Sequence, residues 1–142
     1  MRPPGKISFH NIGDLRIARS AELKSFILKK VKDEGRDVNT IDIIFCDDEF
    51  LLNINQEFLQ HDTYTDIITF DLSEPDGPVV AELYISVDRV RENSLNLNVL
   101  FSKELRRVIF HGILHLCGYN DKTPAEKSEM RSKEDMWLQE YG

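Results

Sequence analysis

Cysteines and long apolar runs are scarce in this chain, and each scarcity excludes a class of protein. Two cysteines occur among 142 residues, Cys46 and Cys117, each within an apolar segment. This number excludes a disulfide scaffold and favours two small, buried hydrophobic side chains in a reducing compartment. The apolar runs are too short to cross a bilayer, and residues 1–6 lead into no apolar segment of a secretion signal. We therefore expect a cytoplasmic globular protein.

Repeats, low-complexity tracts and linkers are also absent, so we expect a single domain over residues 1–142. The net charge of −7 argues against a nucleic-acid partner when taken alone. However, residues 1–36 carry nine basic side chains and four acidic ones, a local balance of +5. Two interpretations fit this basic segment: a face that binds anions, or a solvated helix surface that keeps the protein soluble.

Apolar residues at alternating and helical spacings predict four strands and five helices. We expect strands over residues 6–10, 41–47, 66–72 and 79–87, and helices over 19–34, 47–58, 88–98, 103–117 and 124–140. A turn signal at residues 75–78 joins the last two strands into a hairpin. Its buried face is expected to carry Ala81, Leu83, Ile85 and Val87. This order indicates an α+β fold, with one small mixed sheet packed with about five helices.

The segment over residues 104–121 carries a pattern typical of a metal site. His111 and His115 are four residues apart, so on a helix both imidazoles point the same way and can reach one metal ion. Gly118 suits a left-handed helix end. After that turn, the returning chain could bring Asp121 to the same point. Two neutral imidazoles and one carboxylate leave a coordination position open for water, as in catalytic zinc sites.

A second interpretation is that both histidines are satisfied core residues on a largely buried helix. The segment also lacks the glutamate that follows the first histidine in zinc peptidases, because Gly112 occupies that position. This absence argues against a metallopeptidase. Glu104, two helical turns before His111, could be an outer partner of the site, although glutamates are also common in first turns because of the helix dipole.

Residues 111–121 read His-Gly-Ile-Leu-His-Leu-Cys-Gly-Tyr-Asn-Asp. This block closely resembles the signature His-Gly-x-Leu-His-Leu-x-Gly-Tyr-Asp-His of the bacterial YbeY family. Two further blocks agree in the same order: residues 65–70 resemble the family's Thr-Asp-Val-Leu-Ser-Phe, and residues 81–86 its Gly-Asp-Ile-x-Ile-Ser strand.

The resemblance implies a metal-dependent endoribonuclease of rRNA maturation, acting on single-stranded regions, with the ribosome or ribosomal proteins as further partners. It also implies one zinc-type divalent ion per chain, on His111, His115 and the residue at position 121. The nucleophile is expected to be metal-bound water, or the metal polarises a phosphoryl oxygen. No catalytic side chain is assigned.

The chain departs from the family pattern at four positions. Asp121 stands where a histidine is usual and Asn120 where an aspartate is usual, while Tyr64 replaces a proline. Aspartate is an ordinary third zinc ligand, but it favours harder metals, so manganese, iron or nickel are alternatives to zinc. Leu59 stands where the family carries an arginine, and it cannot hold a phosphate.

Another base must replace that arginine if the protein is active. His61 and Arg89 are candidates that the sequence does not place near the metal. Thr65 and Asp66 are expected to line the cleft, although this pair is also an ordinary strand start. Four lysines of the first helix are expected to approach RNA phosphates: Lys24, Lys29, Lys30 and Lys32.

Three other functions remain open at this point. Leu59 favours a ribosome-associated RNA-binding factor with little or no catalysis. The two histidines and one carboxylate also suit an iron oxygenase, although nothing in the chain suggests the larger barrel of such enzymes. A metallopeptidase is the weakest alternative because of Gly112.

Overall fold

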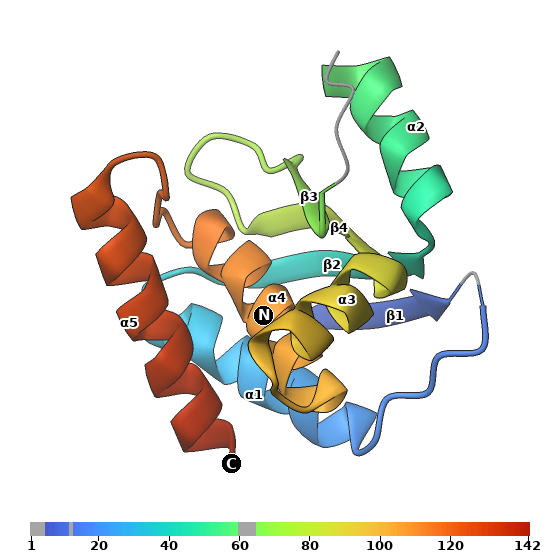
Figure 1. Ribbon diagram of the computed structural model, residues 1–142. Helices are drawn as coiled ribbons and strands as arrows, with labels where there is room; N and C mark the ends of the chain where they lie inside the picture. Colours follow the sequence, from blue (N-terminus) through green and yellow to red (C-terminus); the bar gives the residue numbers. More distant parts are fainter. Residues whose placement is uncertain (1–4, 12, 60–64) are drawn as a thin grey trace.

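The computed structural model describes residues 5–11, 13–59 and 65–142 (Figure 1). The four strands in this part of the chain are β1 (Lys6–Asn11), β2 (Val38–Cys46), β3 (Ile67–Asp71) and β4 (Val79–Ser86). They form one sheet in the order β1-β2-β4-β3. β1, β2 and β4 run parallel, whereas β3 pairs antiparallel with β4 at the sheet edge. The small mixed sheet and the β3–β4 hairpin of the sequence analysis are confirmed.

The described residues also form five helices, in the expected order. They are α1 (Ser20–Asp33), α2 (Asp48–Leu59), α3 (Val87–Leu97), α4 (Phe101–Leu116) and α5 (Pro124–Tyr141). Asp47 caps α2 as expected, because its carboxylate accepts a hydrogen bond from the Phe50 amide at 2.8 Å. Within the described part of the chain, no helix combines the length and the apolar character that a membrane crossing requires.

The two faces of the sheet are covered by different helices. Ile43, Leu83 and Ile85 point to one face, where they are fully buried in the main core with residues of α1, α4 and α5. The alternate positions point to the other face, where Cys46 and Ile68 pack with buried residues of α2. The expected buried face of the hairpin is thus confirmed at residues 81, 83 and 85, whereas position 87 begins α3 and is half-buried.

Helix α4 lies unusually close to the β3–β4 hairpin, and Gly112 makes this approach possible. A Cβ atom at this position would lie 2.6 Å from Ile67 Cδ1 and 2.7 Å from Leu83 Cδ2, well inside van der Waals contact. A larger residue would require the ends of these two core side chains to shift. Gly112 therefore allows the histidine-bearing helix to pack closely against the start of β3.

Helix α5 packs along α4 and carries the predicted capping box. Thr123 Oγ1 accepts from the Glu126 amide at 3.1 Å, and Glu126 Oε1 accepts from the Thr123 amide at 2.9 Å. Further along, the rings of Phe110 and Trp137 meet edge to face with centroids 5.6 Å apart. The capping box thus fixes where α5 begins, and the ring contact packs α5 against α4.

Candidate metal centre

The end of α4 gathers three donor atoms at one point. Gly118 adopts φ +100°, as its position at the helix end predicts, and the chain turns back there. Asp121 then returns to the helix, with its Oδ2 3.2 Å from His111 Nε2 and 3.4 Å from His115 Nε2. The two Nε2 atoms are 3.1 Å apart. His111, His115 and Asp121 form the one such donor cluster among the described residues, and we call it the metal triad.

The spacing of the triad fits a zinc-type ion. A tetrahedral ion with bonds of 2.0–2.1 Å keeps its donor atoms about 3.3–3.4 Å apart. The three observed separations of 3.1–3.4 Å match these edges without rearrangement. All three side chains are half-buried, and all three line a cleft. The donor set and its openness are those of a catalytic rather than a structural site.

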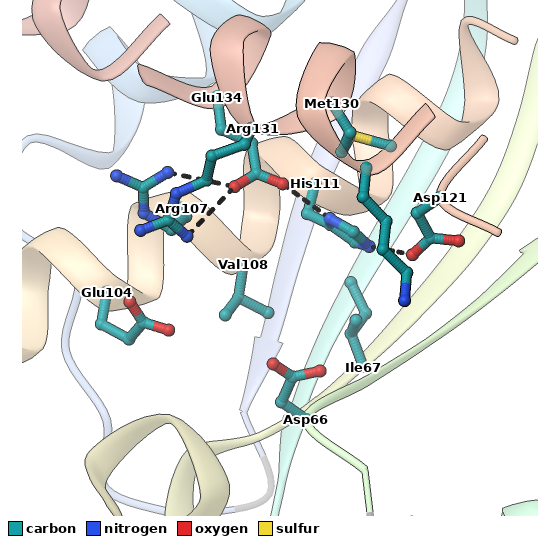
Figure 2. A pocket seen from close by; sticks show the side chains of 11 residues that line it. Asp66, Ile67, Glu104, Arg107, Val108, His111, Asp121, Met130, Arg131 and Glu134 are labelled. Carbon is teal, nitrogen blue, oxygen red and sulfur yellow. Dashed lines mark hydrogen bonds and ion pairs between the residues drawn. The ribbon is translucent and has the colours of Figure 1, made fainter. Parts of the chain in front are cut away.

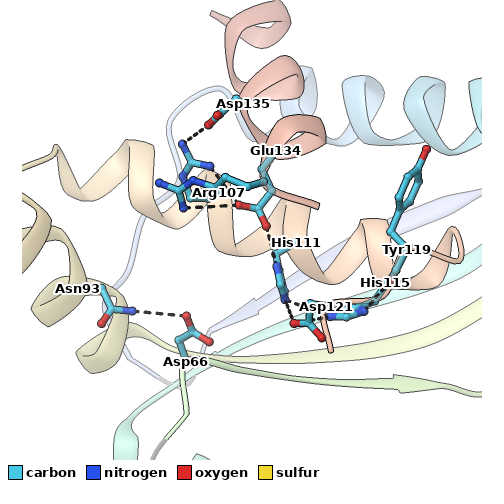
Figure 3. Close-up of polar contacts among 10 residues, drawn as sticks. Asp66, Asn93, Arg107, His111, His115, Tyr119, Asp121, Glu134 and Asp135 are labelled. Carbon is cyan, nitrogen blue, oxygen red and sulfur yellow. Dashed lines mark hydrogen bonds and ion pairs between the residues drawn. The ribbon is translucent and has the colours of Figure 1, made fainter. Parts of the chain in front are cut away.

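Each imidazole is oriented by a partner on its other nitrogen (Figure 3). His111 Nδ1 lies 2.7 Å from Glu134 Oε2, and His115 Nδ1 lies 2.9 Å from the Tyr119 carbonyl oxygen. Both acceptors require the proton on Nδ1, which leaves Nε2 with a free electron pair directed at the triad. The turn at Gly118 thus brings two groups to the triad: the Asp121 carboxylate and the Tyr119 carbonyl that orients His115.

Glu134 is the centre of a largely buried charge network between α4 and α5. Its side chain is 6% exposed and accepts from Arg107 Nη1 at 3.1 Å. Arg107 also donates to Asp135 at 2.7 Å. Burial acts to lower the pKa of His111, but the hydrogen bond and charge of Glu134, with smaller contributions from Asp121 and Asp66, raise it above its ordinary value.

The metal triad lies between two lobes of one cleft. The α5 lobe, with a cavity of about 380 Å³, is bounded by α4, α5 and the start of β3, and includes Glu104, Arg107 and Arg131 (Figure 2). The β3 lobe, of about 620 Å³, is lined by α2 and β3, including Asn55, Leu59 and Thr65. Asp66, Ile67, His111 and Asp121 line both lobes. A strand of substrate could therefore pass across the triad from one lobe into the other.

Two carboxyl groups near the triad are protected from solvent. Burial raises the pKa of Asp66, and the nearby His111 opposes this shift. Asn93 Nδ2 also donates to Asp66 Oδ2 at 3.4 Å. Burial likewise raises the pKa of Glu104, against the opposing charge of Arg107. These groups can therefore hold a proton at higher pH than ordinary carboxyl groups.

The structure brings some of the predicted substrate residues to the cleft and leaves others away from it. Thr65 lines the β3 lobe and Asp66 lines both lobes. Lys24, Lys29, Lys30 and Lys32 lie on α1, and none of them lines either lobe. Lys30 instead forms an ion pair with Glu140, and the Lys24 ammonium lies 5.1 Å from the centroid of the Phe9 ring.

The candidate bases of the sequence analysis have different outcomes. Arg89 is paired with Asp48 at 3.1 Å and also with Glu92, and it lines neither lobe. His61 and Tyr64 lie outside the described residues. Leu59 is present at the wall of the β3 lobe. Glu104 lines the α5 lobe, but the partner of His111 is Glu134.

Sequence reasoning missed Glu134, although a signal was present. On α5 the buried residues Met130, Glu134, Trp137 and Leu138 follow helical spacing. Glu134 is therefore an acidic residue on the apolar stripe of an amphipathic helix. Because burying an unpaired charge is costly, such a residue indicates a buried partner.

The fold and the triad together define a class: a small α+β protein with a cluster of two histidines and one carboxylate that could hold a metal ion. The chain belongs to the YbeY family, since the family model described as "Endoribonuclease YbeY" matches residues 8–142. A relative of that name from Christiangramia forsetii is 44% identical over 131 residues, which cover 92% of this chain and 91% of the relative.

Two further similarities agree with this membership. A relative named "Endoribonuclease YbeY" from Porphyromonas gingivalis strain W83 is 46% identical over 134 residues, covering 94% of this chain and 88% of the relative. The solution structure of a Thermotoga maritima protein aligns with a TM-score of 0.68 and 33% identity. That alignment covers 96% of this chain and 89% of the other.

Proposed function

We propose that this protein is a metal-dependent endoribonuclease that cuts single-stranded rRNA during ribosome maturation in the cytoplasm. The observation that carries the proposal is the metal triad, whose three donors lie 3.1–3.4 Å apart at the floor of a cleft. Membership of a family whose relatives are named endoribonucleases supports RNA as the substrate. Ribosomal proteins are the expected neighbours of such a substrate.

The proposed metal ligands are His111, His115 and Asp121. The donor set and spacing suit zinc, an aspartate ligand favours harder ions such as manganese or iron, and nickel is a further alternative. When bound, such an ion supplies a Lewis acid for a phosphoryl oxygen and for a water molecule. Glu134 and the Tyr119 carbonyl hold both imidazoles in the tautomer that this role needs.

The chain's own side chains would position the RNA and move protons. Thr65 and Asp66 lie where a strand crossing the triad must pass. Asp66 lines both lobes beside the triad, and burial raises the pKa of its carboxyl, which is the direction that a proton-transfer group needs. We therefore assign Asp66 the proton transfer and Thr65 a hydrogen bond to the substrate.

One observation favours a second function, an RNA-binding factor of the ribosome with little catalysis. The described lining of the β3 lobe contains no arginine or lysine, and Leu59 lies in its wall. Negative charge on the phosphoryl oxygens would then be stabilised from one side of the triad alone. Both functions require RNA binding, and only the endoribonuclease requires cleavage of the RNA.

The test compares His111→Ala with His10→Ala, a matched histidine variant. His10 lies on β1, outside the cleft. Its side chain is exposed and pairs with Asp42 of β2 at 2.8 Å. Metal content of the purified proteins, cleavage of an unstructured RNA oligonucleotide and rRNA processing in cells are measured for both. We expect His111→Ala to lose the metal and both activities, and His10→Ala to keep all three. Normal processing by a metal-free His111→Ala protein would support the binding factor.

A further inference from the structure

The α5 lobe carries two exposed basic side chains beside the metal triad. Lys127 and Arg131 are four residues apart on α5, so they lie on one face of the helix. Both line the lobe that His111 and Asp121 also line. The Arg131 side chain is 58% exposed, and Lys127 is also exposed. The two side chains therefore border the cleft mouth from one helix (Figure 2 labels Arg131).

The protein itself makes little use of these two charges. Arg131 Nη1 lies 3.9 Å from Glu134 Oε1, the same oxygen that accepts from Arg107 at 3.1 Å. Across residues 5–11, 13–59 and 65–142, no carboxylate lies within ion-pair distance of the Lys127 ammonium. Arg107 differs, because it is 13% exposed and bound by both Glu134 and Asp135. Arg107 is thus structural, whereas Lys127 and Arg131 remain open to a ligand.

The charges of the two lobes indicate which kind of ligand this is. Among described residues, the lining of the β3 lobe holds three aspartates and no arginine or lysine. The lining of the α5 lobe holds three basic residues and four acidic ones, a balance of −1 against −3 in the β3 lobe. A divalent ion on the triad, which borders both lobes, makes these balances +1 and −1. An anionic group next to the metal is therefore favoured in the α5 lobe and disfavoured in the β3 lobe.

We propose that Lys127 and Arg131 bind a backbone phosphate of the RNA strand, adjacent to the phosphodiester that lies at the metal triad. This inference rests on the proposed function, since it requires an RNA substrate. The proposal places the flanking phosphate in the α5 lobe. It assigns no contact to the base of that nucleotide. Phosphate contacts position a strand without selecting its sequence, so the effect is the same for RNA of any sequence.

The test uses the double variant Lys127→Gln/Arg131→Gln in the full chain loaded with zinc. Its matched control is Lys6→Gln/Arg16→Gln, which also removes one lysine and one arginine from exposed positions that line neither lobe. Cleavage of an unstructured RNA oligonucleotide gives kcat and KM. Fluorescence anisotropy gives RNA binding as a function of salt, and competition with a chromophoric chelator gives zinc affinity.

We expect the α5 double variant to raise KM about tenfold at low salt, as the loss of two exposed ion pairs implies. Its kcat should stay within about twofold, because the phosphate that they bind is not the one that is cut. The slope of log affinity against log salt should flatten by about 1.4, or 0.7 per lost contact on a single strand. Zinc affinity should not change. Arg131→Lys, with Lys127 intact, should keep most of the wild-type KM because it keeps the charge.

Several results would overturn the inference. An unchanged KM and salt slope would leave both side chains without a role in RNA binding, and an equal loss in the control would show a general charge effect. A loss of zinc affinity would show that the α5 residues support the metal triad instead. If wild-type protein neither binds nor cuts the oligonucleotide, the proposed function itself fails, and this outcome is distinct from the others.

Discussion

The two lobes beside the metal triad are built in different ways. The wall of the α5 lobe is held by largely buried ion pairs, in which Arg107 joins Glu134 and Asp135 and Glu134 in turn holds His111. The β3 lobe is walled by an edge strand and by amide, hydroxyl and apolar side chains such as Asn55, Thr65 and Leu59. Paired charges of both signs are thus concentrated on one side of the triad, whereas the other side carries only aspartates among its described charged residues.

The largest effect is expected at Asp121, the proposed ligand that lines both lobes. Asp121→Ala should weaken zinc binding by more than the ~100-fold typical of lost outer partners, because it removes a direct ligand. Asp121→His should still bind zinc, and as a neutral ligand it should shift the pH–rate profile toward lower pH. Chelator competition and pH–rate measurements check both variants. Full zinc occupancy in Asp121→Ala would remove this residue from the site.

The next largest effect on zinc binding is expected at Glu134, which links the ion pairs of the α5 lobe to His111. Glu134→Ala should weaken zinc binding by about 100-fold and Glu134→Gln by about tenfold, since glutamine keeps the acceptor but loses the charge. Asp135→Asn is the matched control, because Asp135 also pairs with Arg107 but makes no contact with His111 in the structure. Equal zinc affinities in Glu134→Ala and Asp135→Asn would show that the network does not act through His111.

The same network predicts opposite pH trends for the metal-free protein and for metal binding. The pKa of His111 is raised in the folded protein, so its stabilising contribution is full below the unfolded value and is lost as pH rises through the folded value. Zinc competes with that proton, so its affinity should fall by up to about tenfold per pH unit below the raised pKa. Thermal unfolding and zinc titrations between pH 5 and 9, roughly the range of histidine titration, check both trends. Glu134→Gln should reduce both pH dependences, and unchanged trends in that variant would contradict this assignment.

The smallest effect is expected in the β3 lobe, which lacks an arginine or lysine among the residues described. Leu59→Arg places a base in the wall of the β3 lobe, at an exposed position that tolerates a long side chain. We expect KM for RNA to fall by about two- to fivefold, the range of one exposed ion pair. Leu59→Gln provides the control of similar length without charge. If both variants behave alike, charge in this lobe has no influence on RNA binding.

The order of helices and strands was predictable because the spacing of apolar residues is a local property of the chain. The pairing of β3 with β4 was predictable from the turn between them, whereas the pairing of β4 with β2 was not, since no local pattern records it. In the site, His111 and His115 were predictable because one helix fixes their distance. Glu134 and Arg131 come from another helix, so their approach to His111 depends on how α5 packs. The lysines of α1 show the converse, since a local excess of charge does not say which side of the molecule it faces.

Gly112 has an evolutionary consequence. In zinc peptidases that bind metal through two histidines of one helix, the residue after the first histidine is the glutamate that acts as general base. Here that position faces the fully buried Leu83 and the side chain of Ile67, at distances that leave no room even for a methyl group. A glutamate introduced there by one substitution would displace the ends of both side chains and disturb the packing of the hairpin against α4. The close packing that brings β3 to the triad thus opposes one route of divergence.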